Sequence, residues 1–146
     1  MRIESAGPAP ARAAICLYAV AVLGTLYPGV VYLSRSEFMP YHARAAGLPW
    51  PAIAAGVQTL LLGLMRTTGI GAVTLGVALA MLLWIPCRRG EQWALRLLPA
   101  LVLLYHGGLL AEMRWVAAAT HAQPPWFLPL IPAAAAIAGA VLSFRR

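Results

Sequence analysis

Residues 95–116, LRLLPALVLLYHGGLLAEMRWV, decide how the rest of the chain is interpreted. This stretch is long and apolar enough to cross the hydrocarbon core of a bilayer, which takes about 20 helical residues. It nevertheless carries His106, Glu112 and Arg114. Polar groups within a membrane span are costly, so these three side chains are the first candidates for functional residues.

The composition indicates that the whole chain is a membrane protein. Hydrophobic residues make up 62% of the 146 residues and charged residues only 10%, whereas a soluble domain carries about 25% charged residues. We therefore predict a single integral membrane domain over residues 1–146. The formal net charge is +7. Because the arginines lie beside apolar segments, the expected partner is the lipid bilayer with its anionic headgroups, not nucleic acid.

The apolar runs predict an all-α fold, a four-helix transmembrane bundle. The first run exceeds the apolar core of a signal peptide, about 7–15 residues, so we expect it to be a retained span. Residues 34–50 are the longest polar connection and are expected to lie at the membrane surface. The four spans are expected at about residues 13–33, 66–85, 93–116 and 126–144.

Residues 51–85 are too long for one span. As a single helix they would extend about 50 Å, well beyond the bilayer core of about 30 Å. One alternative divides them at Arg66 and gives five spans. The other places an outer interfacial or re-entrant helix, residues 51–65, before a span at 66–85. We favour the second, because five spans would put Arg88 and Arg89 outside, against the positive-inside rule.

Four spans put both termini in the cytoplasm, and two patterns agree with that topology. Seven arginines fall in the predicted inner segments and four in the outer ones, the direction that the positive-inside rule predicts. All five tryptophans fall at predicted membrane boundaries, as in an aromatic belt. The outer arginines are Arg35, Arg44, Arg66 and Arg114.

A polar cluster is predicted at the outer boundary of the bundle. Counted from the cytoplasmic ends of their spans, Arg66 and Glu112 both lie about 30 Å away. We therefore expect them to form an interhelical ion pair. Tyr105 is predicted on the same helix face as Glu112, and Arg114 is expected to reach outward to the headgroups. Tyr41 is expected to fold over the outer mouth of the bundle.

His106 is predicted about 20 Å from the cytoplasmic edge, within the hydrocarbon. It is either a proton carrier or acid/base group, or a neutral histidine that donates to a helix carbonyl or to Tyr105 of a neighbouring copy. We favour the second interpretation, because no second catalytic group shares its depth.

Other chemistry has weaker support in the sequence. His42, His121 and Glu112 could supply ligands for a transition metal, but their spacing is scattered, so no metal and no cofactor are predicted. Two cysteines, Cys16 and Cys87, form no metal-binding or redox motif. The chain also lacks a phosphate-binding loop, a nucleophile elbow and a dinucleotide fingerprint.

Four sequence blocks resemble an uncharacterised family of small bacterial four-span membrane proteins: FMPYHARAAGLPW, LLLGLMR, IPCRRGEQWA and PPW. The resemblance covers residues 38–126 and implies the bacterial inner membrane, but no activity. In gross architecture the chain is also similar to DoxX-like proteins and to small multidrug exporters. The exporters carry a carboxylate in their first span, where this chain has none. Four-span membrane glutathione transferases carry a Glu-Arg-Asn cluster, and this chain has no Asn.

Three functional classes follow from these observations. We favour a non-enzymatic accessory or scaffold protein that binds other membrane proteins or itself through its helix faces. The alternative is a membrane-embedded enzyme that acts on a lipid-like substrate, with Glu112 and His106 or His42 as acid/base groups. A transporter subunit ranks third, because the inner half of the spans holds almost no polar side chain.

Overall fold

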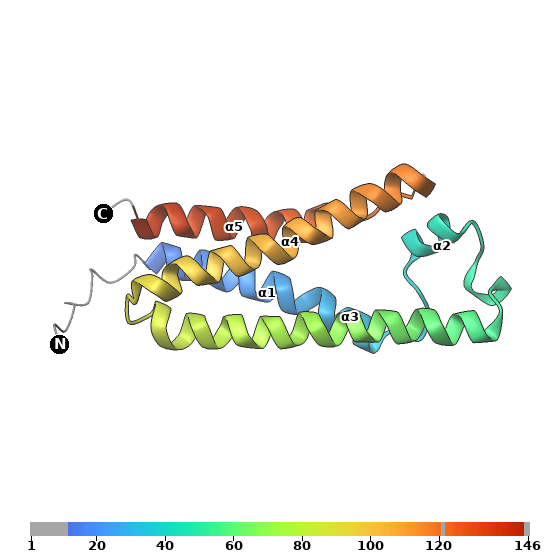
Figure 1. The fold of residues 1–146 in the computed structure, drawn as a ribbon, viewed down its shortest axis with the longest axis horizontal. Coiled ribbons are helices and arrows are strands. Elements are labelled where there is room, and N and C mark those ends of the chain that lie inside the picture. Colours follow the sequence, from blue (N-terminus) through green and yellow to red (C-terminus); the bar gives the residue numbers. More distant parts are fainter. Residues whose placement is uncertain (1–11, 121, 145–146) are drawn as a thin grey trace.

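A computed structural model describes residues 12–120 and 122–144, and within these two ranges the chain is helical with no strand. Each of the four long helices is long and apolar enough to cross a membrane, and they lie together as a bundle (Figure 1). The predicted all-α, four-helix transmembrane architecture is therefore confirmed. The helices are α1 (Arg12–Ser34), α3 (Ala55–Leu82), α4 (Gln92–Thr120) and α5 (Phe127–Phe144).

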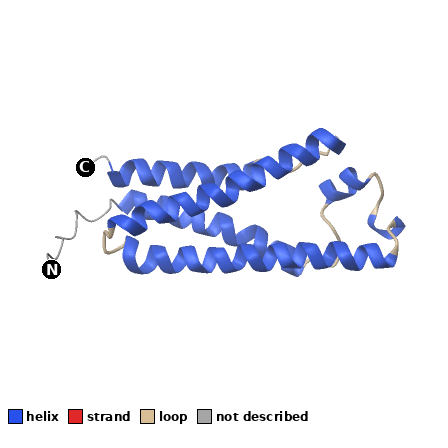
Figure 2. Ribbon diagram, viewed as in Figure 1, coloured by secondary structure: helices blue, strands red, loops and turns tan. Residues whose placement is uncertain are grey.

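A short additional helix, α2 (Pro40–Ala46), lies between the first two long helices. The extra outer helix predicted there exists, but the structure forms it at residues 40–46 rather than 51–65. Loops flank it on both sides, as Figure 2 shows. It begins at Pro40, whose missing N–H costs nothing in a first helical turn. It ends at Gly47, which adopts a left-handed conformation with φ of 67°.

Helix α3 continues through the polar residues that sequence analysis treated as an interruption. The hydroxyls of Thr67 and Thr68 donate to the carbonyls of Gly63 and Leu64, one helical turn earlier. These bonds satisfy the hydroxyls within the helix itself, so no turn forms at Arg66. Neither a hairpin nor a separate span beginning at residue 66 is observed.

The resulting helical segment is longer than a bilayer is thick. A π-helical turn, Leu83–Cys87, extends α3 to give 33 helical residues, Ala55–Cys87. At about 1.5 Å per residue this segment is about 50 Å long, so it tilts or extends beyond a hydrocarbon core of about 30 Å. The π turn contains Pro86, which has no N–H for a regular helical bond.

The bundle is tightly packed at the end where α3 turns into α4. Tyr18, Leu79, Leu95 and Leu98 are fully or almost fully buried there. Small residues allow this packing: a Cβ on Gly139 would lie 2.7 Å from the Tyr18 ring. We call this end, around these five residues, the closed half.

The other end of the bundle is splayed. Helix α1 packs on α3 and α5, whereas α4 packs mainly on α5. In Figure 1, α4 diverges from α3 toward the end that carries α2. We call this end, around α2, Tyr32 and Met113, the open half.

Candidate functional site

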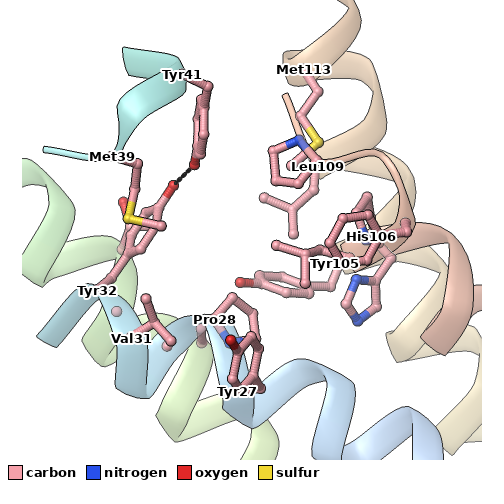
Figure 3. A pocket seen from close by; sticks show the side chains of 18 of the residues that line it. Tyr27, Pro28, Val31, Tyr32, Met39, Tyr41, Tyr105, His106, Leu109 and Met113 are labelled. Atoms are coloured by element: carbon pink, nitrogen blue, oxygen red, sulfur yellow. Dashed lines mark hydrogen bonds between the residues drawn. The ribbon is translucent and has the colours of Figure 1, made fainter. Parts of the chain in front are cut away.

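The open half contains an apolar cavity of about 440 Å³, formed by α1, α3, α4, the start of α5 and α2. Most of its lining is aliphatic or aromatic, including Leu109, Met113 and Phe127. We call it the tyrosine cavity because of the four tyrosines in its wall, Tyr27, Tyr32, Tyr41 and Tyr105. Figure 3 shows the Tyr105 hydroxyl directed into the space between the α1 and α4 walls.

A second cavity of about 560 Å³ lies between α3 and α4 below α2. We call it the side cavity; its wall includes Leu61, Leu64, Glu112 and Val116. The two cavities adjoin, because several residues line both. The shared residues are Tyr32, Tyr41, Thr68, Leu109 and Met113.

Helix α2 covers both cavities and is held by polar and aromatic contacts. The hydroxyls of Tyr32 and Tyr41 form a hydrogen bond (Figure 3). Arg44 Nη1 donates to Gln123 Oε1 at 3.5 Å, which joins α2 to the connection between α4 and α5. Burial raises the pKa of Tyr41 above its ordinary value, so this phenol is neutral.

His42 is part of the same cover. The backbone N–H of Met39 donates to His42 Nδ1 at 3.4 Å, and the Tyr41 ring lies edge-on with its centroid 4.2 Å from that of His42. Burial lowers the pKa of His42, because the charged imidazolium would lose hydration among these rings. The imidazole is therefore a neutral packing element at pH 7.

His106 lies in the wall of the tyrosine cavity and is fully buried. Its Nε2 is 3.0 Å from the hydroxyl of Thr25 on α1. That hydroxyl also donates to the Ala21 carbonyl at 2.9 Å. The histidine therefore has a specific partner on another helix, the Thr25 hydroxyl, which was not among the partners expected from the sequence.

The structure brings together only part of the predicted polar cluster. Tyr41 and Tyr105 line the tyrosine cavity, and Tyr41 and Glu112 line the side cavity. Arg66 and Arg114 are exposed and lie in the wall of neither cavity.

The ion pair expected between Arg66 and Glu112 is not formed. Within residues 12–120 and 122–144 the one ion pair joins Arg35 and Glu37, with 3.7 Å between Nη2 and Oε1. The two residues do not meet, because α3 and α4 diverge toward the open half and the side cavity lies between them.

The three candidate acid/base residues fall in two places. His42 and Glu112 line the side cavity, whereas His106 lines the tyrosine cavity. His106 and Glu112 are separated by about 9 Å along α4, at about 1.5 Å per residue. No group of three potential metal ligands occurs in the described part of the chain, and His121 lies outside it.

Thr25 and two of the cavity tyrosines, Tyr27 and Tyr32, were not predicted from the sequence. Thr25 is fully buried among apolar residues of α1. A threonine within an apolar span is a weak signal, because its hydroxyl is often satisfied within its own helix. Pairing Thr25 with His106 requires knowing that the two residues lie at the same level of adjacent helices.

Comparison of the chain with known protein families, curated proteins and solved structures finds no match. The resemblance of the four quoted blocks therefore stays a prediction.

Proposed function

We propose that this protein binds a lipid-like molecule in the tyrosine cavity and carries out no chemistry of its own. The observation that supports the proposal is the tyrosine cavity itself, about 440 Å³ with a mostly apolar wall and a few polar groups. Ligand sites in proteins are typically clefts of about 300–1,000 Å³ with this kind of lining. An aliphatic chain fits the apolar wall, and the tyrosine hydroxyls offer hydrogen bonds to a polar end.

Access from the bilayer is the second element of the proposal. The side cavity lies between α3 and α4, and both helices are long and apolar enough to cross a membrane. A bilayer molecule can therefore enter sideways without passing through water. Leu64 lines this cavity and is 57% exposed, as expected of a side chain at an opening on the side of the bundle.

This proposal keeps the non-enzymatic accessory role expected from the sequence, with the ligand held inside the bundle. Binding of other membrane proteins or of a second copy would use the outer helix faces. Gly63 on α3 and Gly107 and Gly108 on α4 have nothing within 4 Å of a Cβ added to them. Such exposed small residues allow another helix to approach closely.

An enzyme acting on a lipid-like substrate is the second candidate function. It is favoured by one observation, that Glu112 and His42 line the same cavity. Two titratable groups around one apolar space are a minimum for acid/base chemistry. Passage of a solute through the bundle is disfavoured, because the closed half is filled by Tyr18, Leu79 and Leu98.

We further propose that the protein resides in a bacterial inner membrane with the closed half toward the cytoplasm. Along the sequence, seven arginines fall in the segments predicted to be cytoplasmic and four in those predicted to be outside, which is the distribution that the positive-inside rule favours. Reporter domains fused after Arg89 and Arg146 should report cytoplasm, and fusions after Arg44 and Ala122 should report the outer side. An outer signal at Arg89 would reverse this orientation.

Photolabelling tests the binding proposal. A phospholipid with a diazirine in one acyl chain is incorporated into vesicles with the purified protein, and the labelled residues are mapped by peptide mass spectrometry. We expect cavity residues such as Tyr32 and Met113 to be labelled. Leu109→Trp should remove this labelling, because Leu109 lines both cavities.

Leu104→Trp is the matched control, because Leu104 lies on the same helix and is 76% exposed. This variant should keep the cavity labelling of the wild type. If wild type and Leu109→Trp are labelled alike, and only on lipid-facing residues, the cavities hold no lipid-like molecule and the proposed function is wrong.

A further inference from the structure

The tautomer of His106 follows from the bonds around Thr25. A threonine hydroxyl has one proton to donate, and Thr25 uses it on the Ala21 carbonyl at 2.9 Å. Thr25 Oγ1 can then only accept at its 3.0 Å contact with His106 Nε2. The proton of the neutral imidazole is therefore on Nε2, and Nδ1 is left as an acceptor.

His106 Nδ1 is buried, and within residues 12–120 and 122–144 it has no hydrogen-bond partner. The side chain lines the tyrosine cavity and is 0% exposed. An unsatisfied buried acceptor is unfavourable, and the great majority of buried polar groups are paired. Figure 3 shows the imidazole on the α4 side of the cavity, behind Tyr105. Because Nδ1 itself has no exposed surface, a group in the cavity reaches it only after a local shift of the side chains around it, such as the adjoining Tyr105 ring.

We propose that the ligand of the tyrosine cavity is an apolar molecule that carries a hydroxyl group, an alcohol or a phenol, whose proton is donated to His106 Nδ1. This inference rests on the proposed function and names the chemical class of its ligand. An ether, an ester or a ketone of the same shape has no proton to donate and leaves Nδ1 unpaired. Thr25 acts as a positioning residue, because it fixes the tautomer that accepts.

Competition between two matched probes tests this inference. The probes are para-octylphenol and its methyl ether, para-octylanisole, which share ring and chain and differ in the donor. Each is titrated against the diazirine phospholipid with the full-length protein in vesicles, and loss of label at cavity residues is measured. We expect the phenol to displace the label at a concentration about two- to tenfold lower than the ether, the factor that one net hydrogen bond supplies.

Two variants assign the preference to His106. His106→Phe keeps an aromatic ring but has no acceptor, so the two probes should become equivalent. Thr25→Val leaves His106 free to carry its proton on either nitrogen, so the preference for the phenol should also fall. Leu104→Trp should retain the full preference, because Leu104 is exposed and lines neither cavity.

A measurement without substitution covers the case in which a variant does not fold. The chain has three histidines, and ¹⁵N spectra of histidine-labelled protein distinguish protonated from unprotonated ring nitrogens. In the wild type, His106 should show a bare Nδ1 whose resonance moves on adding the phenol and is unchanged by the ether. A protonated Nδ1 in the free protein would contradict the inference.

The outcomes separate this inference from the proposed function. Labelling that is never specific to the cavity means that the proposed function itself fails. Cavity-specific labelling that both probes displace equally, or that neither displaces, overturns only the inference about the hydroxyl. A preference for the phenol that survives in His106→Phe also overturns it, because another group would then be the acceptor.

Discussion

The closed half and the open half are built from the same four helices but are packed differently. In the closed half, glycines and alanines face bulky side chains, and Tyr18, Leu95 and Leu98 fill the space between helices. In the open half, α3 and α4 diverge, and the space between the helices is lined by tyrosines and aliphatic side chains. The difference shows how side-chain size along a helix sets where the bundle is solid and where it is hollow.

The two halves also differ in how completely their buried polar side chains are hydrogen-bonded. In the closed half, the Tyr18 hydroxyl donates to the Leu95 carbonyl at 3.2 Å and lies 3.4 Å from Ser143 Oγ. In the open half, one nitrogen of His106 is bonded and the other has no partner within residues 12–120 and 122–144. A buried polar group whose hydrogen bonds are all formed stabilises the bundle. A buried polar group that lacks a hydrogen-bond partner and belongs to a cavity-lining residue points to a ligand.

The largest effect is expected in the closed half, from Gly139→Val. Even a Cβ at this position would lie 2.7 Å from Tyr18 Cε1, and the hydrogen bonds of Tyr18 prevent its ring from moving freely. We expect the free energy of unfolding to fall by about 1–3 kcal/mol, the usual cost of overpacking. Thermal melting in detergent measures it.

Gly108→Val is the matched control, with the same change of helix propensity. A Cβ on Gly108 meets nothing within 4 Å, so this variant should melt near the wild type. Equal destabilisation by both variants would mean that close packing at Gly139 does not distinguish the two halves.

A smaller effect is expected in the open half, at the bond between Thr25 and His106. Thr25→Val removes the acceptor of a buried N–H, and His106→Phe removes the donor with little change of volume. The double variant should be more stable than the sum of the single effects predicts, with a coupling of about 0.6–1.5 kcal/mol. Additive melting effects would show that the two side chains contribute independently.

The sequence predicted the architecture because apolar runs and polar loops are local features. The lengths and compositions of residues 13–33, 93–116 and 126–144 suffice to place α1, α4 and α5. The error at Arg66 arose because Thr67, Thr68 and Gly69 interrupt the apolar run in the sequence. In the structure the threonines bond within their own helix, and Gly69 packs against the backbone of Gly29, whose carbonyl oxygen would lie 2.9 Å from a Cβ added to Gly69.

The site was predictable only in its individual residues. His106 and Glu112 stand out as polar residues in an apolar span, and Tyr41 was expected over the mouth of the bundle. Helical periodicity gives depth and face but not the distance between two helices. Whether Arg66 meets Glu112, or Thr25 meets His106, depends on the divergence of α4 from α3, and that follows from packing over the whole bundle.

Acidic pH should destabilise helix α2, which covers the cavities of the open half, before it destabilises the closed half. Burial lowers the pKa of His42, so its stabilising contribution is complete above the ordinary histidine pKa of about 6.5 and is lost as the pH falls below it. Hydrogen exchange, corrected for its intrinsic pH dependence, should therefore rise at residues 40–46 at acidic pH, while residues 94–102 stay protected.

His42→Phe is the control, because it keeps a ring without a titrating group. Its exchange at residues 40–46 should not depend on pH in this range. Two charged groups near His42 would change how strongly acid destabilises α2. Glu112 lines the same cavity and would reduce this destabilisation by attracting the imidazolium. Arg44, on α2 itself, would increase it by repelling the imidazolium. Exchange that rises equally in both halves would point to global unfolding instead.

The smallest effect is expected from the charges of the open half that do not meet. Arg66, Glu112 and Arg114 are exposed, and among the described residues none of them forms an ion pair. Substitutions of exposed side chains away from special features usually change stability by less than about 0.5 kcal/mol. Arg66→Gln, Glu112→Gln and Arg114→Gln should therefore melt alike, and Arg66→Gln/Glu112→Gln should equal the sum of its parts. A coupling between Arg66 and Glu112 above about 1 kcal/mol would mean that α3 and α4 close on each other in the membrane, which would remove the side cavity and the lateral entry path.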